Sequence, residues 1–340
     1  MSKKYNVAIV GATGAVGQSL IEILEERDFP VENLYPLASS RSAGEVILFK
    51  GKSCRVQNLE TFDFTQAEIG LFSAGGAISK IYAPKAAEAG CVVIDNTSEF
   101  RYHDNIPLVV PEVNEAAIAD YKNTGIIANP NCSTIQMLVA LKPIYDHYGI
   151  DTINVATYQS VSGSGKAGLN ELAGQTSKLL NGLDIEANVY SRQIAFNVIP
   201  HIDVLQDNGY TKEEMKMVWE TQKIFADDSI KVNPTAVRVP VFYGHSEAVH
   251  VKTNKPFELD DVIKHLKQAD GVEVIHDEQE MTYASAAVDG TGTDPVFVSR
   301  IRRGLDSDQS LNLWVVSDNI RKGAALNSIQ IAEKLIENYL

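Results

Sequence analysis

The sequence predicts an α/β protein of two domains, the first built on a doubly wound parallel sheet and the second on a mixed, largely antiparallel sheet. Three observations predict this. Up to about residue 132, short apolar runs alternate with amphipathic helical patterns, as in parallel α/β sheets. Beyond it, the strand-like segments become longer and more polar, which is typical of antiparallel sheets. A glycine-rich turn also separates the first expected strand from the first expected helix.

Hydrophobic periodicity predicts the elements of the first domain. Apolar runs predict the strands, and patterns with a period near that of an α-helix predict the helices. The expected strands cover residues 5–10, 34–38, 69–74, 91–95 and 125–129, and the expected helices cover residues 15–27 and 79–89.

The same criteria predict the elements of the second domain. Strands are expected at residues 153–161, 235–243, 247–254, 296–304 and 310–318, and helices at residues 166–180, 211–226 and 259–269. The last segment, residues 322–338, predicts an amphipathic helix.

Composition limits the possible functions. The chain has 340 residues, 44% of them apolar, which is enough for two domains with large cores. Its net charge of -14 argues against a nucleic-acid partner, because phosphate backbones require clustered Lys and Arg. A small phosphorylated substrate needs only a local cationic pocket.

The sequence contains neither a membrane-span pattern nor a metal-ligand pattern. No apolar run reaches the length of a membrane span, so we expect no transmembrane helix, no membrane partner and a cytoplasmic location. The histidines and the three cysteines show no metal-ligand spacing, so no metal site is expected.

The glycine turn, GATGAVG at residues 11–17, lies between an expected strand and an expected helix. Glycines let phosphate oxygens approach the backbone, and the N-terminus of the following helix supplies N–H donors and partial positive charge. A lone glycine motif also fits a mere tight turn, but its place in the first βαβ unit favours a Rossmann-type dinucleotide site.

The end of the second expected strand indicates which dinucleotide binds. NAD enzymes usually place an acidic residue there, to bind the ribose 2′-hydroxyl. This chain instead has Ser39, Ser40, Arg41 and Ser42. A guanidinium with neighbouring hydroxyls suits a 2′-phosphate, which predicts NADP. A solvated surface arginine is the plainer interpretation of Arg41.

Cys132 is a candidate nucleophile. It lies in NPNCST, residues 129–134, directly after the fifth expected strand and at the start of an apolar helical pattern. Backbone amides at a helix N-terminus stabilise a thiolate. From the residues alone, a reactive and a structural cysteine are equally good interpretations. Cys54 and Cys91 lack this setting, and Cys91 opens an apolar strand.

The order and spacing of nine segments resemble those of the aspartate-semialdehyde dehydrogenase family over essentially the whole chain. The segments are VGATGAVG (10–17), ASSRSAG (38–44), SAGG (73–76), DNTSEFR (95–101), NPNCST (129–134), YQSVSGSG (158–165), RQIAFNVIP (192–200), RVPVFYGHSE (238–247) and SDNIRKGAA (317–325).

The resemblance implies a reaction and an assembly. The reaction is the NADPH-dependent reductive dephosphorylation of L-aspartyl-4-phosphate to L-aspartate 4-semialdehyde, a step toward lysine, diaminopimelate, threonine and methionine. The implied protein is a homodimer. Its NADP domain comprises residues 1–132 and 322–340, and its catalytic and dimerisation domain comprises residues 133–321.

The resemblance also implies residue roles. Cys132 matches the acyl-thioester nucleophile, His245 the general acid–base and Gln159 the residue that orients the thiohemiacetal. The matched substrate contacts are Arg238 for the carboxylate, Glu213 for the amine, and Arg101, Asn131 and Lys216 for the phosphate. The matched cofactor contacts are Gly11, Thr13, Gly14, Ala15, Val16, Ser40, Arg41, Ser42, Ser73, Gly75, Ser162, Gly163 and Asn319.

Several plainer interpretations remain open. His245 could be a solvated loop histidine, and Arg101 could only neutralise the acidic residues before it. Glu213 and Lys216 are three residues apart, the spacing of an ordinary surface ion pair. Backbone amides near Cys132 are the expected oxyanion donors. The segment YQSVSGSG also departs from the family, with Ser160 and Ser164 where Ala is common.

Three other functions compete with this interpretation. An aldehyde-phosphate dehydrogenase of glycolysis would usually use NAD and an acidic ribose contact, which residues 39–42 lack. An N-acetyl-glutamyl-phosphate reductase would use the same chemistry on a blocked amine, which Glu213 could not pair. A catalytically inactive Rossmann-type binding protein would have no need of Cys132, Gln159 and His245 together.

We predict that Arg41→Ala raises the KM for NADP while the KM for NAD stays nearly unchanged. A charge-assisted contact contributes about 1.5–3 kcal/mol, or roughly one to two decades in affinity. Steady-state kinetics with both cofactors measure this. Equal losses for NADP and NAD would show that Arg41 supports the loop and does not bind the 2′-phosphate.

Overall fold

The computed structural model describes residues 3–276 and 282–340. The chain divides into two compact units, Met1–Pro130 with Ala324–Leu340, and Asn131–Gly323. The sequence-based boundaries differ from this division, because they assign Asn131, Cys132 and residues 322–323 to the first domain. Asn131 and Cys132 open helix α4 (Cys132–Tyr148), which packs on the sheet of the second unit.

The first unit is built on a six-stranded parallel sheet in the order β5-β2-β1-β6-β7-β8. The strands are β1 (Tyr5–Val10), β2 (Val31–Ala38), β5 (Gln57–Asn58), β6 (Ile69–Phe72), β7 (Val92–Asp95) and β8 (Ile126–Ala128). Strand order reverses between β1 and β6, which makes their carboxyl ends the topological switch point where such sheets bind ligands. The predicted doubly wound sheet is confirmed.

Helices α1 (Ala15–Glu26), α2 (Gly76–Glu88), α3 (Pro111–Asn114) and α8 (Leu326–Asn338) belong to this unit. The apolar faces of α1 and α8 enter one core with β1 and β6, as their periodicity predicts. The predicted last helix begins at residue 322, whereas the structure has a π-helical turn, η6 (Arg321–Ala325), before α8.

The sequence analysis missed a hairpin in this unit, β3 (Val46–Phe49) and β4 (Lys52–Arg55). Its two turn residues, Lys50 and Gly51, both have positive φ, 47° and 73°. Such turns usually carry Asn-Gly or Asp-Gly, so a lysine at the first position hides the signal.

The second unit contains a six-stranded sheet in the order β10-β9-β11-β14-β13-β12. Its strands are β9 (Ile150–Gln159), β10 (Lys231–Arg238), β11 (His245–Thr253), β12 (Val272–Val274), β13 (Val296–Arg303) and β14 (Ser310–Ser317). The three central pairings are antiparallel and the two outer ones are parallel, so the predicted mixed, largely antiparallel sheet is confirmed. The strand expected at 235–243 ends at Arg238, just before Pro240, whose nitrogen cannot donate.

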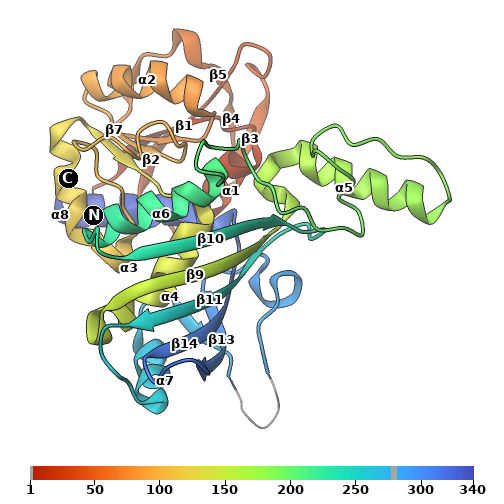
Figure 1. Ribbon diagram of the computed structural model, residues 1–340. Coiled ribbons are helices and arrows are strands. Elements are labelled where there is room, and N and C mark those ends of the chain that lie inside the picture. The colour runs from red at the N-terminus through yellow and green to blue at the C-terminus, as the bar shows by residue number, and fades with distance from the viewer. Residues whose placement is uncertain (1–2, 277–281) are drawn as a thin grey trace. The chain divides into compact units, whose positions relative to one another are not determined.

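One face of this sheet is covered by α4, α6 (Lys212–Phe225) and α7 (Leu259–Gln268). The other face carries partly exposed side chains, among them the aromatic pair Tyr158–Trp314. Helix α5 (Gly165–Leu180) and the loop after it extend beyond the ends of β9 and β10 (Figure 1). This arm, residues 165–200, exposes large apolar side chains, including Leu180, Leu183 and Phe196.

Candidate active site

Cys132 is the first residue of α4 and is partly exposed. The N-cap residue is Asn131, whose side-chain oxygen accepts hydrogen bonds from the main-chain N–H groups of Ser133 at 3.0 Å and Thr134 at 3.4 Å. The structure therefore places the sulfur of Cys132 at the positive end of a 17-residue helix.

The same cap bears on the backbone amides that were expected to donate to the oxyanion. The amides of Ser133 and Thr134 are held by Asn131, and the amide of Ile135 donates to the Asn131 carbonyl. These three amides are therefore engaged in the helix cap and the first helical turn, and a role of the Cys132 amide as an oxyanion donor stays a prediction.

Glu213 lies in the first turn of α6, which begins with a capping box between Thr211 and Glu214. Its buried carboxylate accepts three hydrogen bonds, from Lys216 Nζ at 2.8 Å, Asn131 Nδ2 at 2.9 Å and Gln159 Nε2 at 3.0 Å. Burial acts to raise the pKa of Glu213, but the Lys216 ammonium and these hydrogen bonds outweigh it and lower the pKa to about 2. The pair is largely buried, so the interpretation as a surface ion pair was wrong.

Lys216 also contacts Asp203, with Nζ at 2.9 Å from the carboxylate. Burial acts to lower the pKa of Lys216, but Glu213 and Asp203 together raise it. One ammonium thus faces two carboxylates, and the local charge balance is negative.

Gln159, Arg238 and His245 meet at the ends of three neighbouring strands. Arg238 pairs with Gln159 in the β9–β10 register, and Ser246 pairs with Tyr158 in the β9–β11 register. His245, one residue before Ser246, therefore lies beside Gln159. The three side chains are buried, whereas Tyr158 is exposed on the opposite face.

His245 is fully buried, so its interpretation as a solvated loop histidine was wrong. Burial, and next the nearby Arg238 guanidinium, lowers the pKa of His245 to about 3. Glu247 follows two residues later on the same face, also fully buried. Burial raises the pKa of Glu247 well above its usual range.

Asn319 forms hydrogen bonds with three further polar groups of the candidate site. Its Oδ1 accepts from the Gly244 N–H at 3.0 Å and from the hydroxyls of Ser160 and Ser162, each at 3.1 Å. A Cβ added to Gly163 would lie 3.0 Å from Arg238 Nη1 and 3.7 Å from His245 Nε2. Ser162, Gly163 and Asn319 therefore lie together with His245.

The glycine turn of the first unit has the close packing that a dinucleotide site requires. Gly11 has φ +91°, and a Cβ there would approach the Ser73–Ala74 backbone to 3.0 Å. A Cβ on Gly17 would lie 2.2 Å from the Gly11 carbonyl oxygen. This turn and the Ser73–Gly75 loop thus meet at the switch point, where residues 13–16 are at least partly exposed.

The N-termini of α1 and α2 lie at this edge of the sheet. Their N-cap residues are Gly14 and Gly75, and no side chain of the described residues caps either helix. The amides there suit a pyrophosphate, so these residues fit a dinucleotide.

Ser40, Arg41 and Ser42 form a turn after β2, closed by a hydrogen bond from the Ser42 N–H to the Ser39 carbonyl. Arg41 is exposed. Within the described chain, no hydrogen bond or ion pair engages its guanidinium. It can therefore contact a ligand at this edge of the sheet.

Arg101 is buried in the first unit and is held by main-chain carbonyls. Its Nε donates to the Asn129 carbonyl and its Nη2 to the Asn96 carbonyl, both at 2.9 Å. These bonds fix the side chain, and its role as a phosphate contact stays a prediction.

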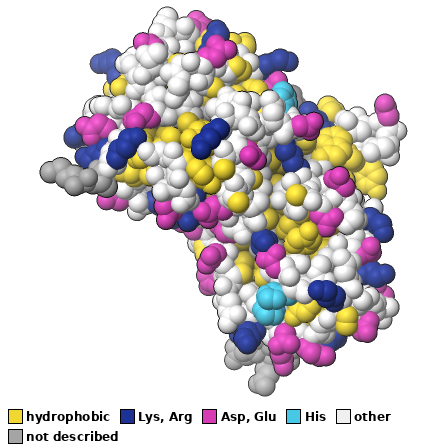
Figure 2. Space-filling view, turned by 90° about the vertical axis from the view of Figure 1, so that its left-hand side faces the viewer, with side chains coloured by type: hydrophobic (Ala, Val, Ile, Leu, Met, Phe, Trp, Pro, Cys, Tyr) yellow, Lys and Arg dark blue, Asp and Glu magenta, His cyan; other side chains and the backbone are white. Residues whose placement is uncertain are grey.

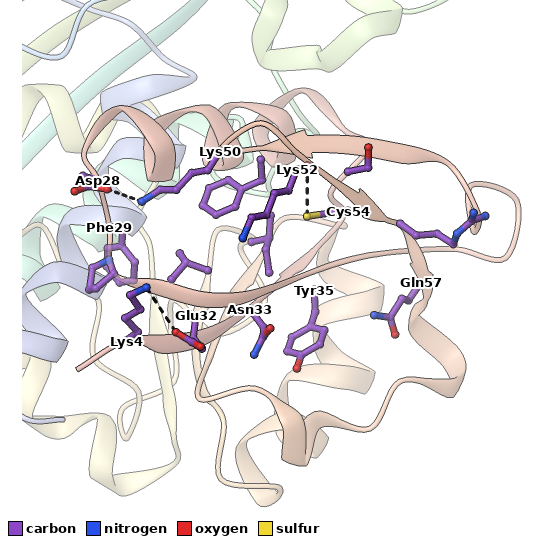
Figure 3. Close-up of a pocket in the computed structure, with 16 residues that line it drawn as sticks. Lys4, Asp28, Phe29, Glu32, Asn33, Tyr35, Lys50, Lys52, Cys54 and Gln57 are labelled. Atoms are coloured by element: carbon purple, nitrogen blue, oxygen red, sulfur yellow. Dashed lines mark hydrogen bonds and ion pairs between the residues drawn. The ribbon is translucent and has the colours of Figure 1, made fainter. Parts of the chain in front are cut away.

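A pocket of about 920 Å³ in the first unit lies between β2 and the β3–β4 hairpin (Figure 3). Ion pairs join Lys50 to Asp28 and Lys4 to Glu32 at its rim. None of the predicted cofactor residues lines this pocket. It follows the side of β2 and does not lie at the switch point, so it is not where this fold binds a dinucleotide.

Two expected absences can be examined only for residues 3–276 and 282–340. There, no group of three or more His, Cys, Asp or Glu side chains could hold a metal ion. No helix in these ranges is long and apolar enough to cross a membrane. On the face shown in Figure 2, acidic and basic side chains are interspersed with apolar patches.

Comparison with known proteins identifies the family. Residues 6–121 match the family model "Semialdehyde dehydrogenase, NAD binding domain", and residues 141–322 match "Semialdehyde dehydrogenase, dimerisation domain". The aspartate-semialdehyde dehydrogenase of Shewanella violacea is 64% identical over 339 residues, covering 100% of both chains. The chain belongs to the aspartate-semialdehyde dehydrogenase family. It is thus an oxidoreductase of amino-acid biosynthesis, and the resemblance seen in the sequence is confirmed.

Solved structures of aspartate-semialdehyde dehydrogenases agree with this assignment. The Vibrio cholerae enzyme II, complexed with ASA, superposes with a TM-score of 0.98 at 61% identity, covering 100% of both chains. The Candida albicans enzyme with NADP has a TM-score of 0.76 at 25% identity, covering 98% of both chains. Full-length relatives of this name favour the family over the N-acetyl-glutamyl-phosphate reductases and over an inactive binding protein.

Sequence reasoning missed two residues of the candidate site. Glu220 is fully buried and its carboxylate accepts the Asn131 N–H at 2.6 Å. Glu220 is seven residues after Glu213, two helical turns along the same face, so the periodicity of α6 could have revealed it. Ser160 was noticed only as a departure, and its partners depend on strand register.

We predict that Glu213→Gln lowers stability at neutral pH and removes much of its pH dependence in acid. The folded pKa, about 2, is below the ordinary value of 4.5. The stabilisation is therefore present above about pH 4.5 and is lost as pH falls toward 2; its size is on the order of 3 kcal/mol. Unfolding free energies from pH 3 to 7 measure this.

Glu258→Gln is a suitable control, because Glu258 forms an exposed ion pair with Arg303. Exposed pairs of this kind contribute only about 0–1 kcal/mol. Parallel pH profiles for the wild type and Glu213→Gln would contradict the assignment of Glu213.

Proposed function

We propose that this protein reduces L-aspartyl-4-phosphate with NADPH to L-aspartate 4-semialdehyde and phosphate, through a thioester on Cys132. The observation that carries the proposal is the position of this cysteine. It is the partly exposed first residue of α4, and its neighbour Asn131 is bonded to the buried Glu213–Gln159 pair. The names of the full-length relatives support the substrate.

The chemistry divides into two steps. The Cys132 thiolate attacks the acyl carbon and expels phosphate, which is ordinary covalent catalysis by an activated cysteine. NADPH supplies the hydride that reduces the thioester. The adduct then re-forms a carbonyl, the carbon–sulfur bond breaks, and its electron pair returns to sulfur. Gln159, held by Glu213, orients the adduct, and His245 is assigned to the oxygen of the adduct, where it stabilises the developing charge.

The substrate brings a carboxylate, an ammonium and a phosphate. Arg238 is assigned to the carboxylate, because a guanidinium makes bidentate contacts with it. The negative balance of Glu213, Asp203 and Lys216 supports the assignment of Glu213 to the ammonium. Arg101, Asn131 and Lys216 are assigned to the phosphate. For Lys216 this requires that the phosphate compete with two carboxylates.

NADP is the proposed cofactor. No carboxylate occurs among residues 39–42, and the exposed Arg41 guanidinium suits a 2′-phosphate. The related Candida albicans enzyme, whose structure was solved with NADP, adds support. The glycine turn, Ser40, Ser42, Ser73, Gly75, Ser162, Gly163 and Asn319 are the remaining proposed contacts.

A cytoplasmic homodimer is the proposed assembly. One face of the sheet of the second unit carries partly exposed side chains, and the α5 arm exposes apolar side chains that a second copy would cover. The match to a dimerisation-domain model supports the same assembly. The three cysteines form no disulfide, which suits a reducing compartment.

We predict a burst of NADPH when the enzyme is mixed with aspartate semialdehyde and NADP without phosphate. Oxidation of the thiohemiacetal gives the thioester, and without phosphate the acyl group stays on Cys132. Stopped-flow absorbance should therefore show about one NADPH per protomer, and peptide mass spectrometry should locate the aspartyl group. Cys132→Ala should show neither, whereas Cys54→Ala and Cys91→Ala should show both. A full burst in Cys132→Ala would sink the thioester mechanism.

A further inference from the structure

The polar groups of Ser160 contact His245, Arg238 and Asn319. Its N–H donates to His245 Nδ1 at 3.1 Å, and its carbonyl accepts from Arg238 Nη1 at 2.6 Å. Its hydroxyl lies 3.1 Å from both Asn319 Oδ1 and His245 Nδ1. The residue is fully buried. Within the described chain, no other residue of the loop after β9, residues 160–164, forms hydrogen bonds with both Arg238 and His245.

The bond from the Ser160 N–H fixes the proton of the imidazole. A main-chain N–H can only donate, so Nδ1 must offer its lone pair. The proton of the neutral ring therefore lies on Nε2. Because burial and Arg238 lower the pKa of His245 to about 3, the ring is neutral near pH 7.

This tautomer limits what His245 can do. Nε2 is buried and has no hydrogen-bond partner among the described residues, and it lies on the side of Gly163. To take the thiol proton on Nε2, the ring would have to carry its own proton on Nδ1, where the Ser160 N–H opposes it. With Nε2–H in place, the ring can instead donate to a negative oxygen.

We propose that Ser160 is a positioning residue that holds His245 as the Nε2–H tautomer, so that the imidazole donates to the oxyanion of the Cys132 adduct. This fits the engagement of the Ser133 and Thr134 amides by Asn131. Hydride addition moves the carbonyl electron pair onto oxygen, where Nε2–H stabilises it. When the carbonyl re-forms, the electron pair of the C–S bond leaves on sulfur, and His245 keeps its proton throughout.

The hydroxyl of Ser160 adds a second link. Asn319 is oriented by the Gly244 N–H, so its Oδ1 faces both serine hydroxyls. Ser160 thereby joins Asn319, a proposed cofactor contact, to the imidazole. A family member with alanine at this position keeps the N–H bond and lacks this link.

Kinetics of Ser160→Ala test the link that the Ser160 hydroxyl makes between Asn319 and His245. Because this role of Ser160 rests on the proposed function, wild-type activity is measured first. Loss of one neutral hydrogen bond should lower kcat about 2- to 10-fold, with KM for aspartate semialdehyde and phosphate within about twofold. Ser164→Ala, the same change four residues on, should leave kcat unchanged, since no hydrogen bond joins its hydroxyl to the site within the described residues.

Two readouts separate positioning from general damage. The isotope effect on kcat of aspartate semialdehyde deuterated at its aldehyde carbon should rise in Ser160→Ala, because the hydride step is slowed; a mere loss of active protein leaves the isotope effect unchanged. In a His245→Ala background, adding Ser160→Ala should lower kcat little further, because both substitutions remove the same function. An unchanged kcat in Ser160→Ala, or a full additional loss in the double variant, overturns the link.

The tautomer is tested independently of turnover by NMR of ¹⁵N-histidine-labelled protein. The signals absent from His245→Ala should show a protonated Nε2 and an unprotonated Nδ1 from pH 6 to 8. A proton on Nδ1, or a charged ring, overturns the proposal even if the enzyme is active. If wild-type enzyme lacks phosphate-dependent NADP reduction, the proposed function fails, whatever the tautomer.

Discussion

Asn131 uses all of its polar groups to hold the start of α4. Its side-chain oxygen takes two amides of the first turn, its side-chain nitrogen donates to Glu213, and its main-chain N–H donates to Glu220. Its carbonyl accepts the first helical hydrogen bond, from Ile135. Every one of these partners is buried. Because a buried polar group without a partner is costly, the position of Cys132, the next residue, follows from these bonds.

The electrostatics of the candidate site depend on ionisable side chains that are buried away from water. Glu213 stays ionised although buried, because Lys216 and two amides surround it, and it holds Gln159 in return. For Glu247, which is equally buried, burial raises the pKa well above its usual range. His245, beside the Arg238 guanidinium, is uncharged at neutral pH because its pKa is lowered to about 3. The site thus contains one retained carboxylate near the proposed ammonium position and an uncharged donor near the proposed oxyanion.

Much of the fold, and the position of Cys132 at the start of a helix, could be predicted from the sequence, because these features depend on local sequence signals. Periodicity and the glycine turn predicted both sheets and most helices, and the apolar pattern after Cys132 predicted that a helix begins there. The Lys50–Gly51 hairpin and the turn before α8 gave weak local signals. The role of Ser160 was not predictable, since it lies 85 residues from His245 along the chain and they meet only through the β9–β11 register. The division at Asn131 likewise depends on packing.

The central claim is that position alone makes Cys132 the reactive thiol, and timed alkylation at pH 7 tests it most directly. The other two cysteines are internal controls, because burial raises the pKa of Cys54 and raises that of Cys91 to about 12. Peptide mass spectrometry after brief exposure to iodoacetamide should show Cys132 labelled at least about tenfold faster than Cys54, with Cys91 unlabelled. Asn131→Ala should slow the labelling of Cys132. Labelling of Cys54 at the same rate as Cys132 would contradict the account.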